Sequence, residues 1–81
     1  MSPDEICRKT VDSPPKLVVR MLDADTILIE GQPRALEFLA ELFKAVASDS
    51  SDDGFSISPR GAGGAFFDKA ATTGIYIHRL D

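Results

Sequence analysis

The sequence predicts an α+β domain of order β-β-α-β-β, in which one helix packs on a four-stranded, mainly antiparallel sheet. Three observations lead to this fold. The chain of 81 residues is long enough for one domain and too short for two. Short aliphatic or alternating segments occur in both halves of the chain, and one longer segment between them has helical periodicity. We expect the domain to span 16–81.

Residues 1–15 are predicted to form a poorly ordered N-terminal tail. Three prolines and scattered charges fall within them, and Ile6 and Val11 are among their few apolar anchors. Such a composition buries too little apolar surface to offset the entropy lost on ordering.

Two strands are predicted at the start of the domain. Leu17–Leu22 is aliphatic and β-branched, and Thr26–Glu30 has the same character. Asp23-Ala24-Asp25 between them are turn formers. Because the connection is short, we expect an antiparallel hairpin.

A helix is predicted to begin at Pro33 and to continue to Ala47. Proline suits the first helical position, because its missing N–H would have no partner within the helix. Apolar residues recur every three or four positions, with charged residues on the opposite side. A stripe this wide is expected to pack on a sheet. It consists of Ala35, Leu36, Leu39, Leu42, Phe43 and Val46, with Phe38 beside it.

Two further strands are predicted after the helix. Phe55–Ser58 alternates apolar and polar residues and is ended by Pro59. A glycine-rich loop follows at 60–64. The segment 65–73 is consistent with a strand extension, a short helical turn or a cap over the core. Ile75–Leu80 is the last strand.

One face of the predicted sheet is left uncovered, because the chain has a single helix to place on it. Strand side chains alternate between faces, so we expect one face to pack on the helix through Ile27, Ile29, Phe55, Ile57, Ile75 and Ile77. A half-apolar, uncovered face often contacts a partner. The candidate partner-binding residues on that face are Leu28, Tyr76 and His78.

Phe66 and Phe67 are adjacent aromatic residues between a glycine-rich loop and two charged residues. Adjacent side chains rarely both face inwards. The simpler interpretation packs one in the core and the other over a strand edge. The functional interpretation makes them exposed aromatic contacts for a partner.

Two loops contain parts of known binding motifs. Asp49-x-Ser51-x-Asp53-Gly54 matches the first half of a calcium loop, but the closing position falls on Arg60, whose charge repels a cation. The run Gly61–Gly64 lacks the Gly-Lys-Ser/Thr ending of a phosphate loop. We interpret both as ordinary loops, and keep the acidic residues as a candidate rim for a basic partner: Asp49, Asp52 and Asp53.

The residues needed for catalysis or metal binding are scarce. His78 is the one histidine and Cys7 the one cysteine. Nucleophilic catalysis needs a nucleophile, a base and an orienting group, and a zinc site needs three or four ligands. We therefore expect neither enzyme activity nor a metal or cofactor.

The net charge of −4, from thirteen acidic and nine basic residues, argues against nucleic acid as the partner, because phosphate binding needs clustered cations. The same charge suits a basic protein partner. No segment reaches the roughly 20 apolar residues of a membrane span, and a single cysteine cannot form an internal disulfide. These features lead us to expect a cytoplasmic protein.

From Ile27 onward the layout resembles the immunity protein 32 family of bacterial polymorphic-toxin systems. The resemblance is carried by Ile27–Gly31, the apolar pattern of Ala35–Ala47, the strand Phe55–Pro59 and the closing segment Ile75–Leu80. It covers about two-thirds of the chain. Members often carry histidine in the strand after the helix, where this chain has Ser56 and Ser58. The resemblance implies a protein that neutralises a toxin domain by direct contact.

Two hypotheses therefore remain open. The domain is either a small binding protein of the immunity kind, or a self-associating structural or regulatory domain that forms a homodimer through its open sheet face.

Overall fold

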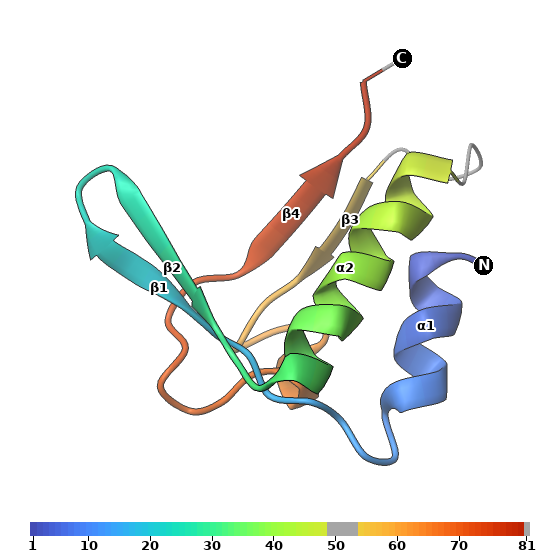
Figure 1. The fold of residues 1–81 in the computed structure, drawn as a ribbon, viewed down its shortest axis with the longest axis horizontal. Coiled ribbons are helices and arrows are strands. Elements are labelled where there is room, and N and C mark those ends of the chain that lie inside the picture. The colour runs from blue at the N-terminus through green and yellow to red at the C-terminus, as the bar shows by residue number, and fades with distance from the viewer. Residues whose placement is uncertain (49–53, 81) are drawn as a thin grey trace.

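The computed structural model describes residues 1–48 and 54–80, and its architecture is α+β (Figure 1). The predicted fold class is confirmed at this level. In chain order the elements are helix α1 (Pro3–Thr10), strands β1 (Val18–Asp23) and β2 (Thr26–Glu30), helix α2 (Pro33–Ser48), strand β3 (Gly54–Ile57), the short 3-10 helix η1 (Gly64–Phe66) and strand β4 (Ile75–His78).

The strands form two separate sheets of two strands each. β1 pairs with β2 and β3 pairs with β4, both antiparallel. The predicted four-stranded sheet covered by one helix is therefore wrong, although the predicted antiparallel hairpin of β1 and β2 is present.

The segment 66–73 explains why the two sheets do not join. It runs along the edge of β1 that faces away from β2. The Asp68 N–H donates to the Leu17 carbonyl (2.8 Å), and the Thr72 N–H donates to the Val19 carbonyl (3.0 Å). This irregular backbone takes up the hydrogen-bonding groups that a neighbouring strand would need.

The N-terminal segment contains a helix where we predicted a poorly ordered tail. The Ser2 hydroxyl accepts a hydrogen bond from the Glu5 N–H (3.2 Å), and the Glu5 carboxylate accepts one from the Ser2 N–H (2.9 Å). This capping box starts α1, with Pro3 in its first turn. A helix of eight residues is not stable alone in water, so its order depends on the buried side chain of Ile6.

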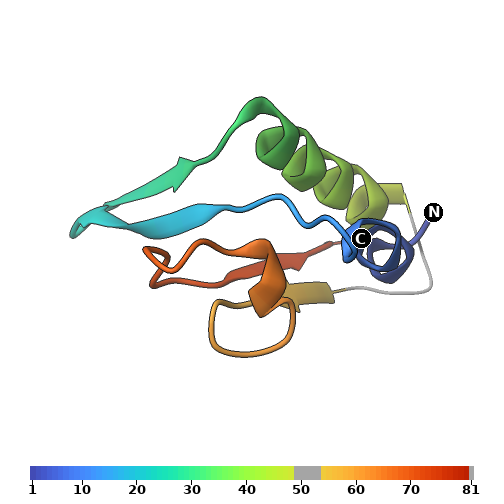
Figure 2. The ribbon, with the colours of Figure 1, turned by 90° about the horizontal axis from the view of Figure 1, so that it is seen from below.

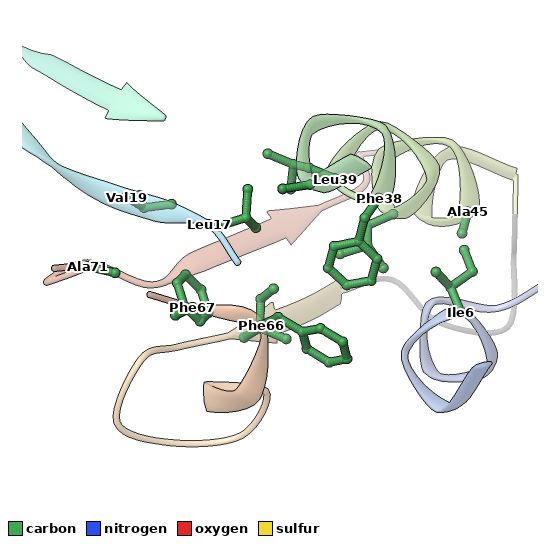
Figure 3. Packing of buried hydrophobic residues seen from close by; sticks show 12 residues of the cluster. Ile6, Leu17, Val19, Phe38, Leu39, Ala45, Phe66, Phe67 and Ala71 are labelled. Atoms are coloured by element: carbon green, nitrogen blue, oxygen red, sulfur yellow. The ribbon is translucent and has the colours of Figure 1, made fainter. Parts of the chain in front are cut away.

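Helix α2 buries most of the predicted apolar stripe, but its buried face is shifted at one flank. Its buried residues are Ala35, Phe38, Leu39, Leu42, Ala45 and Val46, whereas Leu36 and Phe43 are exposed. The cause is α1, which packs against α2 (Figure 1). Ile6 of α1 points towards α2 beside Ala45 (Figure 3). The buried face is therefore rotated towards the Phe38 and Ala45 side.

The segment 65–73 caps the core. Phe66 and Phe67 are both buried, and Phe66 stacks on Phe38 with ring centroids 4.7 Å apart. Two adjacent side chains can both point inwards because the backbone changes from the 3-10 helix η1 to an extended conformation at Phe67 (φ −120°, ψ 142°). Figure 3 shows Phe66 on the Phe38 side of the core and Phe67 on the side of Leu17 and Val19.

Candidate functional site

The hairpin of β1 and β2 carries an aliphatic face. Its register places Val19 opposite Ile29, and Met21 opposite Ile27. Residues directly opposite each other in an antiparallel pair share one face of the sheet, and so do alternate residues of each strand. We refer to these four side chains, Val19, Met21, Ile27 and Ile29, as the aliphatic face.

Burial falls along this face from the base of the hairpin towards its tip. The exposed fraction of the residue is 1% for Val19, 41% for Ile29, 47% for Met21 and 53% for Ile27. The hairpin projects beyond α2 and beyond the rest of the chain (Figures 1 and 2). The aliphatic face therefore starts inside the core and continues into solvent.

A second exposed apolar strip lies on α2. Leu36, Ala40, Phe43 and Ala47 are exposed, and their spacing places them on one side of the helix. This side adjoins the buried face of α2, on the flank opposite to Phe38 and Ala45. Helix α2 therefore also presents apolar surface that α1 leaves uncovered.

The residues predicted to share one open sheet face are split between the two sheets. Tyr76 and His78 are exposed on β4, with ring centroids 6.3 Å apart. Leu28 is half-buried on the hairpin, opposite Arg20 on the face that does not carry Val19. The single uncovered face of our prediction is therefore wrong, because its four-stranded sheet does not form.

The remaining predicted site residues are the aromatic pair and the three aspartates that follow α2 in the sequence. Phe66 and Phe67 are core residues, so their interpretation as exposed contacts for a partner is wrong. Asp49, Asp52 and Asp53 lie outside the described residues.

Sequence reasoning missed Met21 and placed Ile27 and Ile29 against the helix. A signal for their exposure was present, since Leu17–Leu22 and Thr26–Glu30 carry apolar residues on both faces of the hairpin. One helix can cover only one face of a sheet, and only along its own length.

Two hollows of the described surface are lined by groups that could carry chemistry. One hollow, of about 420 Å³, is lined by Lys16, Arg60 and Lys69 with Asp68 and apolar neighbours, and its lining contains no serine, threonine, cysteine or histidine. A hollow of about 340 Å³ includes Cys7. Burial raises the pKa of this thiol, which disfavours the reactive thiolate at neutral pH.

Within residues 1–48 and 54–80, no three or more His, Cys, Asp or Glu side chains are grouped so as to hold a metal ion. None of the helices in this part of the chain has the length and apolarity to cross a membrane.

Comparison with protein-family models, curated proteins and solved structures finds no match to this chain. Its function is therefore inferred from its own residues and their geometry.

Proposed function

We propose that this domain binds a protein partner through the aliphatic face of the hairpin and acts by covering a surface of that partner, without catalysis. One observation carries the proposal. The aliphatic face is buried at Val19 and about half-exposed at Met21, Ile27 and Ile29.

These three exposed side chains offer apolar surface that a partner can bury. Full burial of an Ile or Met side chain is worth about 1.5–3 kcal/mol relative to full exposure. Each of the three still has roughly half of its surface in water, so a partner that covers them adds apolar burial at a preformed site. Exposed apolar surface that continues from a core is typical of interaction sites.

Charge and the family resemblance support a basic toxin domain as the partner. A net charge of −4 favours encounter with a basic protein. The resemblance to immunity proteins suggests a toxin domain as that protein, bound tightly enough to block its activity. Nucleic acid is disfavoured by the same charge.

The proposal is tested by affinity capture of the tagged chain from its native lysate, with quantitative mass spectrometry. We compare wild type with Met21→Glu, and use Leu80→Glu as the matched control, because Leu80 is an exposed apolar residue outside the hairpin. A stoichiometric protein that is lost with Met21→Glu and retained with Leu80→Glu is the expected result. A partner recovered equally with both variants would contradict the role of the hairpin.

The captured protein is then purified for kinetic measurement. The association rate is expected to fall as salt is raised, since charge steers the encounter. A rate that does not change with salt would remove the argument for a basic partner.

A further inference from the structure

Strand β2 has one paired edge and one free edge within the described part of the chain. The backbone hydrogen-bonding groups of Leu17 and Val19 point away from β2, because they form hydrogen bonds with the segment 66–73. The N–H and C=O groups of successive residues point to opposite edges of a strand. The hydrogen bonds from β1 to β2 are therefore formed by Val18 and Arg20.

The same alternation fixes the direction of the groups in β2. Val18 is opposite Glu30, and Arg20 is opposite Leu28, so Leu28 and Glu30 direct their N–H and C=O groups towards β1. Ile27 and Ile29 consequently direct theirs to the free edge. These are also two residues of the aliphatic face.

The free edge carries no lysine, proline or bulge that would block pairing. Natural edge strands are blocked by lysine, proline or a bulge. β2 has the sequence Thr-Ile-Leu-Ile-Glu, without lysine or proline, and the irregularity of the hairpin register lies at Met21/Asp23 of β1. A regular, aliphatic edge strand is well suited to receive another strand.

We infer that β2 pairs antiparallel with β2 of a second copy of this chain, with Leu28 on the twofold axis. This inference rests on the proposed function, in that it takes the hairpin as the interaction surface and names one of its occupants. Ile27 then faces Ile29 of the second copy, and each such pair exchanges two backbone hydrogen bonds. An interface of this kind is isologous, so the same strand serves both copies.

The sequence of β2 is complementary to itself in this register. Leu28 faces Leu28, and Glu30, the one charged residue of the strand, faces Thr26 of the second copy. Like charges directly opposite would be destabilising, and this pairing has none. If the register shifted by one residue, backbone groups directed to the free edge of one β2 would lie opposite groups directed towards β1 in the other. The hydrogen bonds between the two copies would then be lost.

Pairing also extends the aliphatic face across both copies. Each row of side chains becomes Val19 and Ile29 of one copy followed by Ile27 and Met21 of the other, according to the register of the hairpin. Two strands that project into water are marginally stable, whereas three or more with an apolar face are stable. The four-stranded sheet therefore stabilises the hairpins and doubles the apolar surface offered to the protein partner.

The test measures the mass of the purified chain by light scattering over a range of concentrations. The expected species at high concentration is a dimer, twice the chain mass of 8.7 kDa. Ile29→Pro removes an N–H that points to the free edge and is not needed by β1, so this variant should be monomeric. Ile29→Ala is its control, because it loses the side chain but retains the N–H, and it should still dimerise, with weaker affinity.

A second pair of variants keeps the inference testable if the proline variant unfolds, which circular dichroism would reveal. Leu28→Lys places two ammonium groups opposite each other on the axis and should weaken dimerisation at least tenfold. Tyr76→Lys changes an exposed residue of the other sheet and should leave the mass unchanged. Dissociation by Tyr76→Lys but not by Leu28→Lys would overturn the inference.

The result is separable from that of the proposed function. Wild type that remains monomeric while its capture of a partner depends on Met21 would refute self-pairing and leave partner binding standing. A dimer lost with Ile29→Pro, together with no captured protein, would support self-pairing and refute the heteromeric partner. Self-pairing would also be refuted if β2 paired with a strand of the captured protein and not with β2 of a second copy.

Discussion

Substitution of Gly63 by alanine tests the packing of the loop before η1. Gly63 has φ +81°, in the left-handed region that costs an L-residue about 1–2 kcal/mol. An added Cβ would also lie 2.7 Å from Cβ of Ile57 and contact its Cγ2. Ile57 is buried in the core and cannot move aside freely. Crowding of this kind costs about 1–3 kcal/mol.

The two costs together predict that Gly63→Ala lowers the free energy of unfolding by about 2–5 kcal/mol. For a domain of this size each kcal/mol shifts the melting temperature by roughly 4–8 °C. We therefore expect a decrease of about 10 °C or more, measured by circular dichroism during thermal unfolding, with urea unfolding as a second measure.

Gly61→Ala is the matched control in the same loop. The Cβ added there would meet the Ser58 hydroxyl at 2.7 Å, which is the end of a short side chain that can rotate away, and Gly61 does not have positive φ. We expect a change within about 0.5 kcal/mol. If Gly63→Ala and Gly61→Ala unfold at the same temperature, the argument from φ and from contact with Ile57 is refuted.

Four further outcomes are expected. Leu42→Ala empties a fully buried position and should cost about 2–5 kcal/mol in urea unfolding, whereas Phe43→Ala on the exposed strip should cost much less; equal costs would place Phe43 in the core. Ser2→Ala should cost about 1 kcal/mol and speed amide exchange in α1, with little effect on exchange in α2. Hydrogen bonds from the Ser2 backbone and side chain lower the pKa of Glu5 below 4.5. The stabilising contribution of the Glu5 carboxylate is therefore present above pH 4.5 and is lost as the pH falls through the lowered pKa. Acid should consequently loosen α1 in wild type more than in Glu5→Gln. Burial raises the pKa of Cys7 above 9.0, so iodoacetamide at pH 8 should alkylate the folded chain more slowly than the chain in urea, and equal rates would contradict the burial of this thiol.

Several features of this chain follow from its sequence because their causes are local. Pro33 and the periodic apolar residues after it specify α2. The two aliphatic segments on either side of Asp23-Ala24-Asp25 specify the hairpin, since a short turn leaves antiparallel pairing as the only arrangement. The α+β class follows from these elements alone.

The N-terminal helix shows where local reasoning was incomplete. Its capping box, Ser2 with Glu5, and Pro3 between them are visible in the sequence, and they mark a helix start. They do not reveal whether Ile6 finds a buried site. That site exists only after α2 has folded, because Ala45 lies beside Ile6 in the tertiary structure (Figure 3).

The candidate site depended on tertiary structure for the same reason. The sequence determined that both faces of the hairpin are apolar, but not which part of each face is covered. The segment 66–73 determines this coverage, because it occupies the edge of β1 and prevents the second sheet from joining the hairpin. Non-local pairing of this kind depends on competition among all strand edges for the same hydrogen bonds. The resulting exposure of Met21, Ile27 and Ile29 is therefore a property of the assembled fold.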